Sequence, residues 1–209
     1  MKKDKKMYAL KEMSKVKIID KKSEKSIKYE KELLMKLKHP FIVNMHYAFQ
    51  DYNNLYIVMD LLNGGDLRYH ISKYRKFSEE QTSNIINLEF FIACILLAIE
   101  YIHENNVLHR DIKPENLVLE DSGYVRLTDF GIAKVYQKEN SSETSGTPGY
   151  MSPEVMCGQN HTILVDYFAI GVMGYEFMNG RVYYTNNRGH MLERVGRRLK
   201  NRLWQSRFW

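Results

Sequence analysis

The sequence of 209 residues is 44% hydrophobic and 27% charged, a composition typical of one globular domain that can bury a sizeable core. Only two cysteines are present, Cys94 and Cys157, which excludes a disulfide framework and favours a reducing compartment. The lysine-rich start leads into no apolar segment, and the longest apolar run, residues 90–99, is too short to span a bilayer. We therefore expect a cytoplasmic protein, with the nucleus as a second compartment, that has no signal peptide and no membrane span.

The formal net charge of +6 is concentrated at the end of the chain. Residues 188–209 contain seven basic side chains and one acid, Glu193, so this segment accounts for the whole excess and the preceding chain is neutral. The basic residues are Arg188, Arg194, Arg197, Arg198, Lys200, Arg202 and Arg207. A nucleic-acid-binding function would depend entirely on this tail, so we expect no nucleic-acid partner.

In the first sixty residues the pattern predicts a strand, a helix and a second strand. Residues 8–11 alternate apolar and polar and end in Lys11, and residues 26–37 have the apolar spacing of a helix. Residues 55–60 form a β-rich run, and the glycines after them predict a flexible connection to a helix. Lys11 and Glu30 are either an ion pair between strand and helix or two unrelated surface charges.

The most specific pattern is His-Arg-Asp-Ile-Lys-Pro-Glu-Asn at residues 109–116, followed by Asp-Phe-Gly at residues 129–131. The first motif contains a carboxylate that can accept or orient the proton of an attacking hydroxyl, and a lysine that can neutralise a transferred phosphoryl group. An amide and a second carboxylate offer hard oxygen ligands suited to Mg²⁺. The candidate catalytic residues are Asp111, Lys113 and Asn116, and the candidate metal ligands are Asn116 and Asp129. Two motifs in this order and spacing indicate phosphoryl transfer.

These motifs resemble the catalytic loop and the metal-binding turn of protein kinases. Residues 146–154, Gly-Thr-Pro-Gly-Tyr-Met-Ser-Pro-Glu, resemble the end of the kinase activation segment, with Ser in place of the usual Ala. The residue types at positions 113–116 and 146–148 favour serine or threonine over tyrosine as the acceptor of the phosphoryl group. Residues 61–70 look most like the yet-another-novel-kinase subgroup of the AGC group, and the whole resemblance covers about residues 5–181.

The resemblance implies an α+β, bilobal protein-kinase-like fold with a small β-rich lobe and a mainly helical lobe. It also implies an ATP-dependent protein serine/threonine kinase whose partners are ATP, Mg²⁺ and protein substrates. In such kinases a strand lysine held by a helix glutamate binds the α- and β-phosphates, and the lobe connector binds adenine and ribose. The residues implied at the nucleotide are Lys11, Glu30, Asp60, Leu62, Asp66 and Val118. Met59 would guard the back of the adenine pocket, although taken alone it is better explained as plain core.

The resemblance assigns supporting roles as well. Asp166 would accept backbone hydrogen bonds from around residues 109–110, and four side chains would stack as the column of an active kinase, although any core supplies such residues. The column residues are Leu34, Met45, His109 and Phe130.

The loop of residues 137–145 contains candidate phosphorylation sites at Ser141, Ser142 and Thr144. The position that is usually phosphorylated in related kinases falls on Glu143. A carboxylate there would pair with Arg110 and partly imitate a phosphate, or it is an uninvolved loop acid.

The chain departs from the kinase pattern in three places. No glycine precedes Tyr8, so we expect the first strands and the Gly-rich loop that covers the phosphates to be missing. Residues 83–89 intervene where related kinases run directly on, so we expect an insertion there. The third departure is the continuation after residue 181, which leaves the family pattern.

Retained introns would explain two of these departures. Residues 83–89 can be encoded by AGT AAT ATT ATT AAT TTA GAA, which contains GTAATATTATTAATTTAG, a short AT-rich segment with intron-like ends. Residues 182–188 can be encoded by GTA TAC TAT ACT AAT AAT AGA, and removal of GTATACTATACTAATAATAG shifts the frame into a kinase-like continuation. We therefore predict that residues 189–209 are out of frame and that a first exon is missing. The alternative, which we favour less, is a basic amphipathic helix within residues 188–209 that binds calmodulin or anionic lipid.

We predict three segments. Residues 1–62 form a partial small lobe with the lobe connector, residues 63–187 form a partial large lobe with the insertion, and residues 188–209 form the basic tail. The truncation predicts impaired activity, and the alternative function is a non-catalytic kinase-like module that binds partners. Loss of the last helices would leave Glu154 unpaired and an apolar face of the Asp166 helix exposed, which predicts marginal stability.

Overall fold

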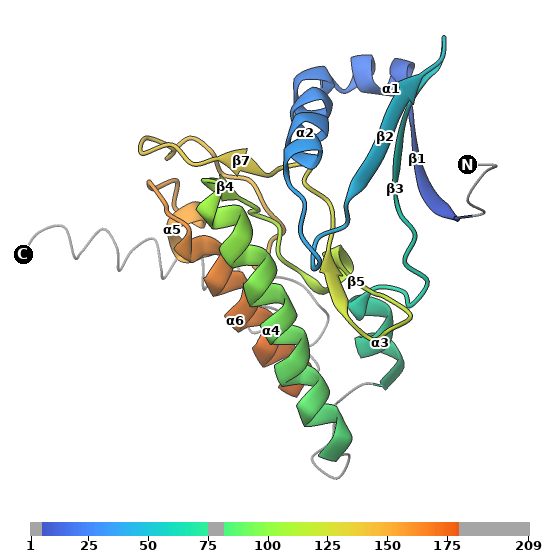
Figure 1. Cartoon of the computed structure of the whole chain (residues 1–209). Helices are drawn as coiled ribbons and strands as arrows, with labels where there is room; N and C mark the ends of the chain where they lie inside the picture. Colours follow the sequence, from blue (N-terminus) through green and yellow to red (C-terminus); the bar gives the residue numbers. More distant parts are fainter. Residues whose placement is uncertain (1–5, 75–81, 180–209) are drawn as a thin grey trace, which may run out of the picture.

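A computed structural model describes residues 6–74 and 82–179. A small sheet with two helices stands above a larger, mainly helical part (Figure 1). The smaller part consists of β1 (Tyr8–Ser14), α1 (Lys15–Asp20), α2 (Glu24–Lys36), β2 (Met45–Gln50) and β3 (Asn54–Asp60). Within the described stretches, no helix has the length and apolar character needed to cross a membrane.

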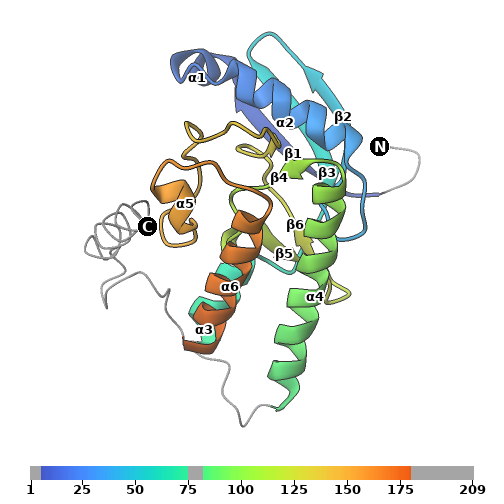
Figure 2. The same ribbon diagram turned by 90° about the vertical axis from the view of Figure 1, so that its left-hand side faces the viewer.

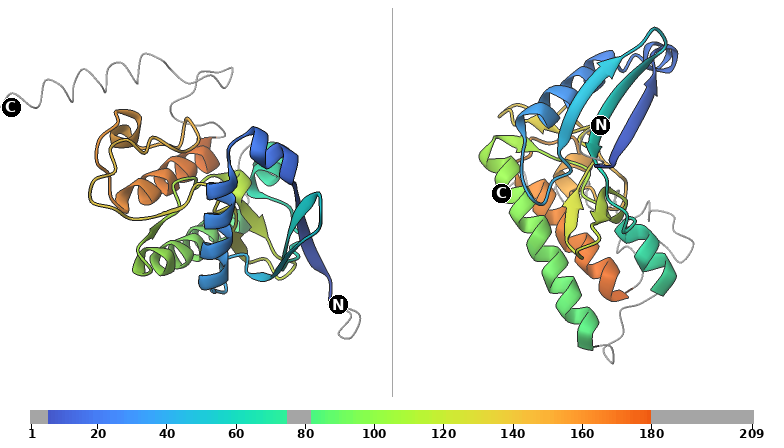
Figure 3. Two further views of the ribbon diagram at one scale, coloured as in Figure 1. Left: turned by 90° about the horizontal axis from the view of Figure 1, so that it is seen from above. Right: turned by 45° about the vertical axis from the view of Figure 1, so that its right-hand side comes forward.

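The sheet is antiparallel, in the order β1-β3-β2, so β3 is the central strand (Figure 3). Its Leu-Tyr-Ile-Val-Met run consists of the aromatic and β-branched types that fit a pleated, half-buried surface. Every residue of β1 has a partner on β3, from Tyr8 opposite Asp60 to Ser14 opposite Asn54. The strands expected at residues 8–11 and 55–60 are confirmed, and the first one is longer than expected.

Helix α2 buries one apolar face formed by Leu33 and Leu34, with Leu37 immediately after it. The expected helix is confirmed, although it begins two residues earlier than predicted. The short helix α1 was not expected. Its six residues are too few for a periodic pattern, and only Ile18 is buried.

The larger part is built around two long helices, α4 (Thr82–Glu104) and α6 (Leu164–Asn179), which lie side by side (Figure 2). Short elements surround them and carry the loops of the site. These elements are α3 (Leu67–Tyr74), β4 (Val107–Leu108), the 3-10 turn η1 (Pro114–Asn116), β5 (Leu117–Leu119), β6 (Val125–Leu127), β7 (Lys134–Val135) and α5 (Pro153–Met156).

One continuous hydrophobic core joins α2 to the two long helices. In α4 the buried residues recur every three or four positions, as a helix with one core-facing side requires. They are Cys94, Ile95, Ala98, Ile99 and Ile102. The apolar run of residues 90–99 is therefore helical as expected but only partly buried, because Leu96 and Leu97 are exposed.

The connector between the two parts requires glycine at residue 64. A Cβ atom there would lie 2.6 Å from Leu119 Cβ and 2.7 Å from the Leu119 carbonyl oxygen, so no side chain fits without a backbone shift. This close approach allows the Gly64 amide to donate to the Leu119 carbonyl at 3.0 Å, while the Leu119 amide donates to Gly65 at 2.9 Å. Gly65 adopts φ of 74°, in the left-handed region.

The described residues include only some of the expected departures from the kinase pattern. Residues 83–89 lie within the first turns of α4, which continues through them as one helix. The tail of residues 188–209 lies outside the described residues. On α6, the side chains of Leu164, Tyr167 and Met178 are exposed. Among described residues, Glu154 has no ion-pair partner.

Candidate active site

Asp166 at the start of α6 fixes the backbone of the candidate catalytic loop. Its carboxylate is 1% exposed and accepts hydrogen bonds from the amides of His109, at 3.0 Å, and Arg110, at 2.8 Å. His103 of α4 places its Nε2 atom 2.8 Å from the same carboxylate. The role expected for Asp166 is confirmed. Because a buried carboxylate needs such partners, this contact joins α4, α6 and the loop.

Two residues next to the reacting groups have left-handed backbone conformations. Arg110 has φ of 67° and Asp129 has φ of 65°, conformations that cost an L-residue on the order of 1 kcal/mol or more. The Arg110 guanidinium donates to the Ile132 carbonyl from Nε at 2.8 Å and from Nη2 at 2.6 Å. Asp129 accepts from the Gly131 amide at 3.2 Å. These contacts hold the catalytic loop and the Asp-Phe-Gly turn against each other.

Asp111 is surrounded by donors. Its carboxylate lies 2.7 Å from Lys113 Nζ and accepts from Thr147 Oγ1 at 2.5 Å and from Asn116 Nδ2 at 3.0 Å. Burial alone would raise the pKa of Asp111, but the hydrogen bonds from Lys113 and Thr147 outweigh burial and place the pKa below its ordinary value. The carboxylate is therefore ionised at neutral pH and can accept a proton.

Thr147 completes this cluster, although no role was predicted for it. Its hydroxyl donates to Asp111 and accepts a hydrogen bond from Lys113 Nζ at 2.7 Å. The contact joins the activation segment to the catalytic loop across thirty-six positions of sequence. The only available signal was its place in the Gly-Thr-Pro triplet.

Asn116 and Asp129 have the oxygen atoms that a magnesium ion would need. Asn116 Nδ2 donates to the Asp111 carbonyl at 2.8 Å, which turns the amide so that its oxygen remains available as a ligand. Asp129 is exposed. Within the described residues, no group of three or more His, Cys, Asp or Glu side chains could hold a metal ion. An amide and a carboxylate fit Mg²⁺ that arrives with a nucleotide, because this ion takes few protein ligands and keeps phosphate and water oxygens.

Lys11 and Glu30 form an ion pair. Lys11 Nζ on β1 lies 2.6 Å from Glu30 Oε1 on α2, and Glu30 is only 5% exposed. Of the two interpretations left open by the sequence, the strand-to-helix pair is confirmed and the unrelated surface charges are wrong. A buried carboxylate with a half-buried lysine fixes the distance between the sheet and α2.

In the connector Asp66 lies beside Val118, whereas the side chain of Asp60 contacts residues of β2 and β6. Asp66 and Val118 form an isolated antiparallel bridge, and the Asp66 carboxylate accepts from the Tyr69 amide at 2.7 Å at the start of α3. The Asp60 carboxylate lies 2.7 Å from His46 Nε2 and accepts from Arg126 Nη1 at 3.0 Å.

The electrostatics of Asp60 follow from these contacts. Burial acts to raise its pKa, but hydrogen bonds from His46 and Asn44 bring the pKa below its ordinary value. These contacts occupy the Asp60 side chain at the end of β3, so only the main chain of Asp60 remains to bind a ligand. Leu62 follows in the irregular connector, and Met59 is half-buried at the end of β3.

The expected hydrophobic column lies in the common core. Leu34 and Phe130 are buried, Met45 packs against the same cluster, and the rings of His109 and Phe130 meet edge to face with centroids 5.0 Å apart. Burial lowers the pKa of His109, so this imidazole is neutral at pH 7.

The activation segment is fixed by Glu143. Its Oε2 accepts from Arg110 Nη1 at 2.8 Å, and its Oε1 pairs with Lys134 Nζ. Of the two interpretations that the sequence left open, the pairing with Arg110 is confirmed. The candidate phosphorylation sites Ser141, Ser142 and Thr144 are all exposed.

Sequence reasoning missed a second charged cluster beside the catalytic loop. Arg68 of α3 donates to Glu115 Oε1 at 2.7 Å, to Glu176 Oε1 at 2.6 Å and to the Tyr150 hydroxyl at 2.5 Å. Tyr150 in turn donates to Glu176 Oε2 at 2.5 Å. These residues lie up to 108 positions apart, so no local pattern could have paired them.

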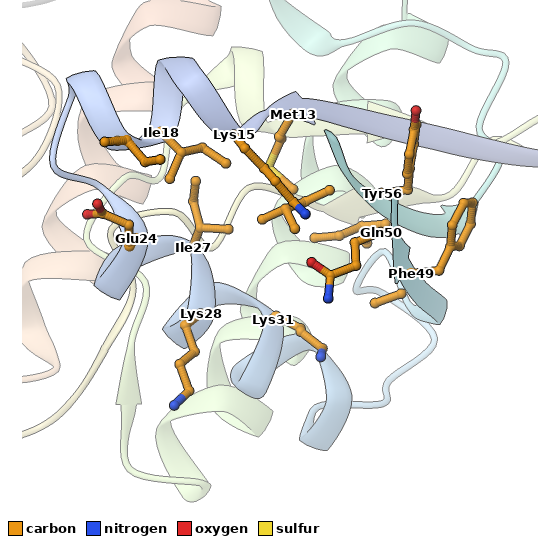
Figure 4. A pocket seen from close by; sticks show the side chains of 14 residues that line it. Met13, Lys15, Ile18, Glu24, Ile27, Lys28, Lys31, Phe49, Gln50 and Tyr56 are labelled. Atoms are coloured by element: carbon orange, nitrogen blue, oxygen red, sulfur yellow. The ribbon is translucent and has the colours of Figure 1, made fainter. Parts of the chain in front are cut away.

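A separate pocket of about 620 Å³ lies in the smaller part, between α1, α2 and the sheet (Figure 4). Ile18 and Ile27 supply apolar walls, while Lys15, Lys28 and Lys31 line its rim. The Lys15 ammonium is engaged by the Asp51 carbonyl at 2.6 Å. No candidate active-site residue lines this pocket.

Comparison with known proteins identifies the family of the chain and agrees with its fold. The family model described as "Protein kinase domain" matches residues 1–205, and the chain belongs to this family. Its α+β architecture is the kinase-like fold that the sequence predicted.

Among curated relatives, a probable serine/threonine-protein kinase of Dictyostelium discoideum is 44% identical over 197 residues, covering 91% of this chain and 41% of the relative. Serine/threonine-protein kinase Sgk1 of Danio rerio is 39% identical, covering 92% of this chain and 44% of the relative. Human Sgk1 is 38% identical, and the match covers 90% of this chain and 43% of the relative. The chain spans less than half the length of these relatives.

Proposed function

We propose that this chain carries the active site of an ATP-dependent protein serine/threonine kinase, which transfers the γ-phosphoryl group of ATP to a protein hydroxyl. The observation that supports this most strongly is the ionised carboxylate of Asp111, held between Lys113, Thr147 and Asn116. A carboxylate fixed in this way beside a cation suits in-line transfer to a neutral hydroxyl. The family and the named relatives point to the same reaction.

The proposed roles follow from the chemistry of each group. Asp111 orients the attacking hydroxyl and accepts its proton as the new oxygen–phosphorus bond forms and the bond to ADP breaks. Lys113 stabilises negative charge on the transferred group. Mg²⁺ bound with ATP neutralises phosphate charge, and Asn116 and Asp129 are its proposed ligands.

On the nucleotide side, Lys11 is proposed to contact the α- and β-phosphates, with Glu30 holding its ammonium in place. The main chain of Asp60 and Leu62 is proposed to meet adenine. Asp66 and Val118, which the structure brings together, are proposed to line the ribose and adenine side of the same site.

Two finer assignments are also proposals. The chain is placed in the AGC group, most like the yet-another-novel-kinase subgroup, because of the sequence of residues 61–70. Its organisation is proposed to be a partial small lobe over residues 1–62, a partial large lobe over residues 63–187 with the insertion 83–89, and an out-of-frame tail from residue 188. Sequencing the spliced transcript tests the tail and the insertion, and a message that retains both segments overturns this explanation.

The test of function separates binding from transfer. Thermal unfolding is measured with and without ATP and Mg²⁺, since a ligand that binds only the folded state raises the apparent stability by about 2.7 kcal/mol at a hundred times its dissociation constant. Phosphate incorporation into a Ser/Thr peptide mixture is measured in parallel for the wild type and for Asp111→Asn. We expect both a thermal shift and transfer, with the variant binding ATP but transferring about 10²–10⁴-fold more slowly.

Other outcomes are informative. A thermal shift without transfer would favour the alternative function, a non-catalytic kinase-like module. No shift at millimolar ATP would overturn the nucleotide site itself.

A further inference from the structure

The smaller part of the molecule ends in an exposed corner formed by α1, the start of α2 and the turn between β2 and β3. This corner stands at the end of the sheet that is far from the long helices α4 and α6 (Figure 1). The Lys15 amide donates to the Asn53 carbonyl at 2.8 Å, and the Lys15 ammonium donates to the Asp51 carbonyl at 2.6 Å. These hydrogen bonds join the helix to the turn, so residues 15–25 and 51–53 form one surface, the α1 corner.

Large apolar side chains of the α1 corner face solvent. Val16 and Ile19 are 65% and 62% exposed, and their spacing of three places them on one side of α1. Only Ile18 of this helix is buried. Tyr52, in the turn, is 93% exposed. The corner therefore presents three side chains that would lose apolar surface to water only on binding a partner.

The turn that carries Tyr52 is ordered by Asp51. Its Oδ1 atom accepts from the amides of Asn53, at 2.8 Å, and Asn54, at 2.7 Å, and its Oδ2 atom accepts from the Tyr56 hydroxyl at 2.8 Å. Because the turn is already held in this conformation, binding through the Tyr52 ring has a small entropic cost.

Lysines are concentrated around these apolar side chains. Residues 15–31 contain seven lysines and three acids, a net charge of +4, although residues 1–187 together are neutral. The lysines are Lys15, Lys17, Lys21, Lys22, Lys25, Lys28 and Lys31, and the acids are Asp20, Glu24 and Glu30. Glu30 is already paired with Lys11. In the part of the chain that the structure describes, none of the seven lysines forms an ion pair.

This combination of side chains identifies the chemistry of the partner. Exposed lysines alone suit any polyanion, whereas Val16 and Ile19 gain only where an apolar phase accepts them. A tyrosine ring, with its apolar body and polar hydroxyl, is typical of the boundary between membrane and water. An anionic bilayer offers both the negative surface and the apolar phase.

We propose that the α1 corner is a docking surface for anionic lipid bilayers. Val16, Ile19 and Tyr52 enter the interface, and the lysines of residues 15–31 face the headgroups. This docking does not depend on the proposed kinase function. No candidate active-site residue belongs to the corner, so a docked chain keeps that site free.

The first experiment removes charge from the corner and measures sedimentation of the full chain with vesicles of equal parts phosphatidylserine and phosphatidylcholine. The basic tail is present in every variant, so differences between variants report on the corner. One lysine near an anionic surface contributes about fivefold to partitioning, so Lys21→Gln/Lys22→Gln should bind about 25-fold more weakly.

Lys36→Gln/Lys38→Gln, at exposed lysines at the other end of α2, is the matched control. A helix of this length spans roughly 20 Å, about twice the Debye length at about 0.1 M salt, so this control should change binding less than about twofold.

The second experiment removes apolar surface and leaves the charge unchanged. Val16→Gln/Tyr52→Gln should weaken vesicle binding about tenfold, and this loss should persist at about 1 M salt, where the effect of the lysines is screened. Leu164→Gln/Met178→Gln, at residues of α6 that are each 63% exposed, is the matched control and should bind as the wild type does.

The third experiment needs no variant. Amide hydrogen exchange of the wild-type chain is compared with and without the same vesicles, and residues 15–25 and 51–53 should exchange at least about twofold more slowly on the bilayer, while α6 stays unchanged.

Three results would overturn the proposal. The first is unchanged exchange at the corner, and the second is equal vesicle binding by Lys21→Gln/Lys22→Gln and its control. The third is binding that depends on the lysines but not on Val16 and Tyr52, because such binding is that of a polyanion partner such as RNA.

Discussion

Substitution of Asp166 should destabilise the fold more than any other single change at the site. Asp166→Ala removes the acceptor of two backbone amides, those of His109 and Arg110, and of the His103 ring nitrogen. Hydrogen bonds to a charged group are worth about 1.5–3 kcal/mol each. Part of this loss is offset because a carboxylate no longer has to be buried without water. We therefore expect the free energy of unfolding to fall by roughly 3–5 kcal/mol, a large part of the ~5–15 kcal/mol of a typical domain.

Urea unfolding followed by circular dichroism measures this change, with equal m-values required for the comparison. Asp166→Asn keeps one oxygen acceptor but turns an NH₂ group toward a donor, so an intermediate loss of about 1–3 kcal/mol is expected. Asp20→Asn, at an exposed acid of α1, should stay within about 0.5 kcal/mol of the wild type. If Asp166→Ala unfolds at the same urea concentration as Asp20→Asn, the buried carboxylate does not organise the loop and the reasoning is refuted.

Three further predictions concern stability. Arg68→Leu leaves the buried Glu176 carboxylate without its cation and should lower the free energy of unfolding in urea by about 2–4 kcal/mol. Adding Glu176→Gln should restore part of this loss. If the losses of the two single variants simply add in the double variant, the pairing is contradicted. Gly64→Ala should destabilise by about 1–3 kcal/mol through the clash with the neighbouring strand. Gly171→Ala in α6, where the added Cβ meets no described atom within 4 Å beyond the adjoining residues and backbone of its own helix, should stabilise by up to about 1 kcal/mol. Equal melting temperatures would refute the steric argument. Burial lowers the pKa of His109 from its ordinary 6.5, so at low pH the unfolded chain binds a proton that the folded chain does not. The free energy of unfolding should therefore fall as the pH drops below about 6.5. His109→Phe should show a shallower decline between pH 7.5 and 5.5.

The sequence predicted the local chemistry of the site because its central residues are contiguous. Asp111, Lys113 and Asn116 lie within one loop, and a 3-10 turn at residues 114–116 is enough to bring the amide back to the carboxylate. Strands β1 and β3 were predictable for a similar reason, since alternation and β-branched residues act along the chain. Strand β2 was not predicted. Helix α1 was missed because one buried residue, Ile18, gives no period.

Contacts between distant segments could not be predicted from such patterns. Hydropathy identifies the face that a helix buries, but not the residue that it meets. The Arg68–Glu176 pair and the Thr147–Asp111 hydrogen bond depend on how α3, α6 and the activation segment pack. The pairing of Lys11 with Glu30 was foreseen only because the kinase resemblance supplied the partner.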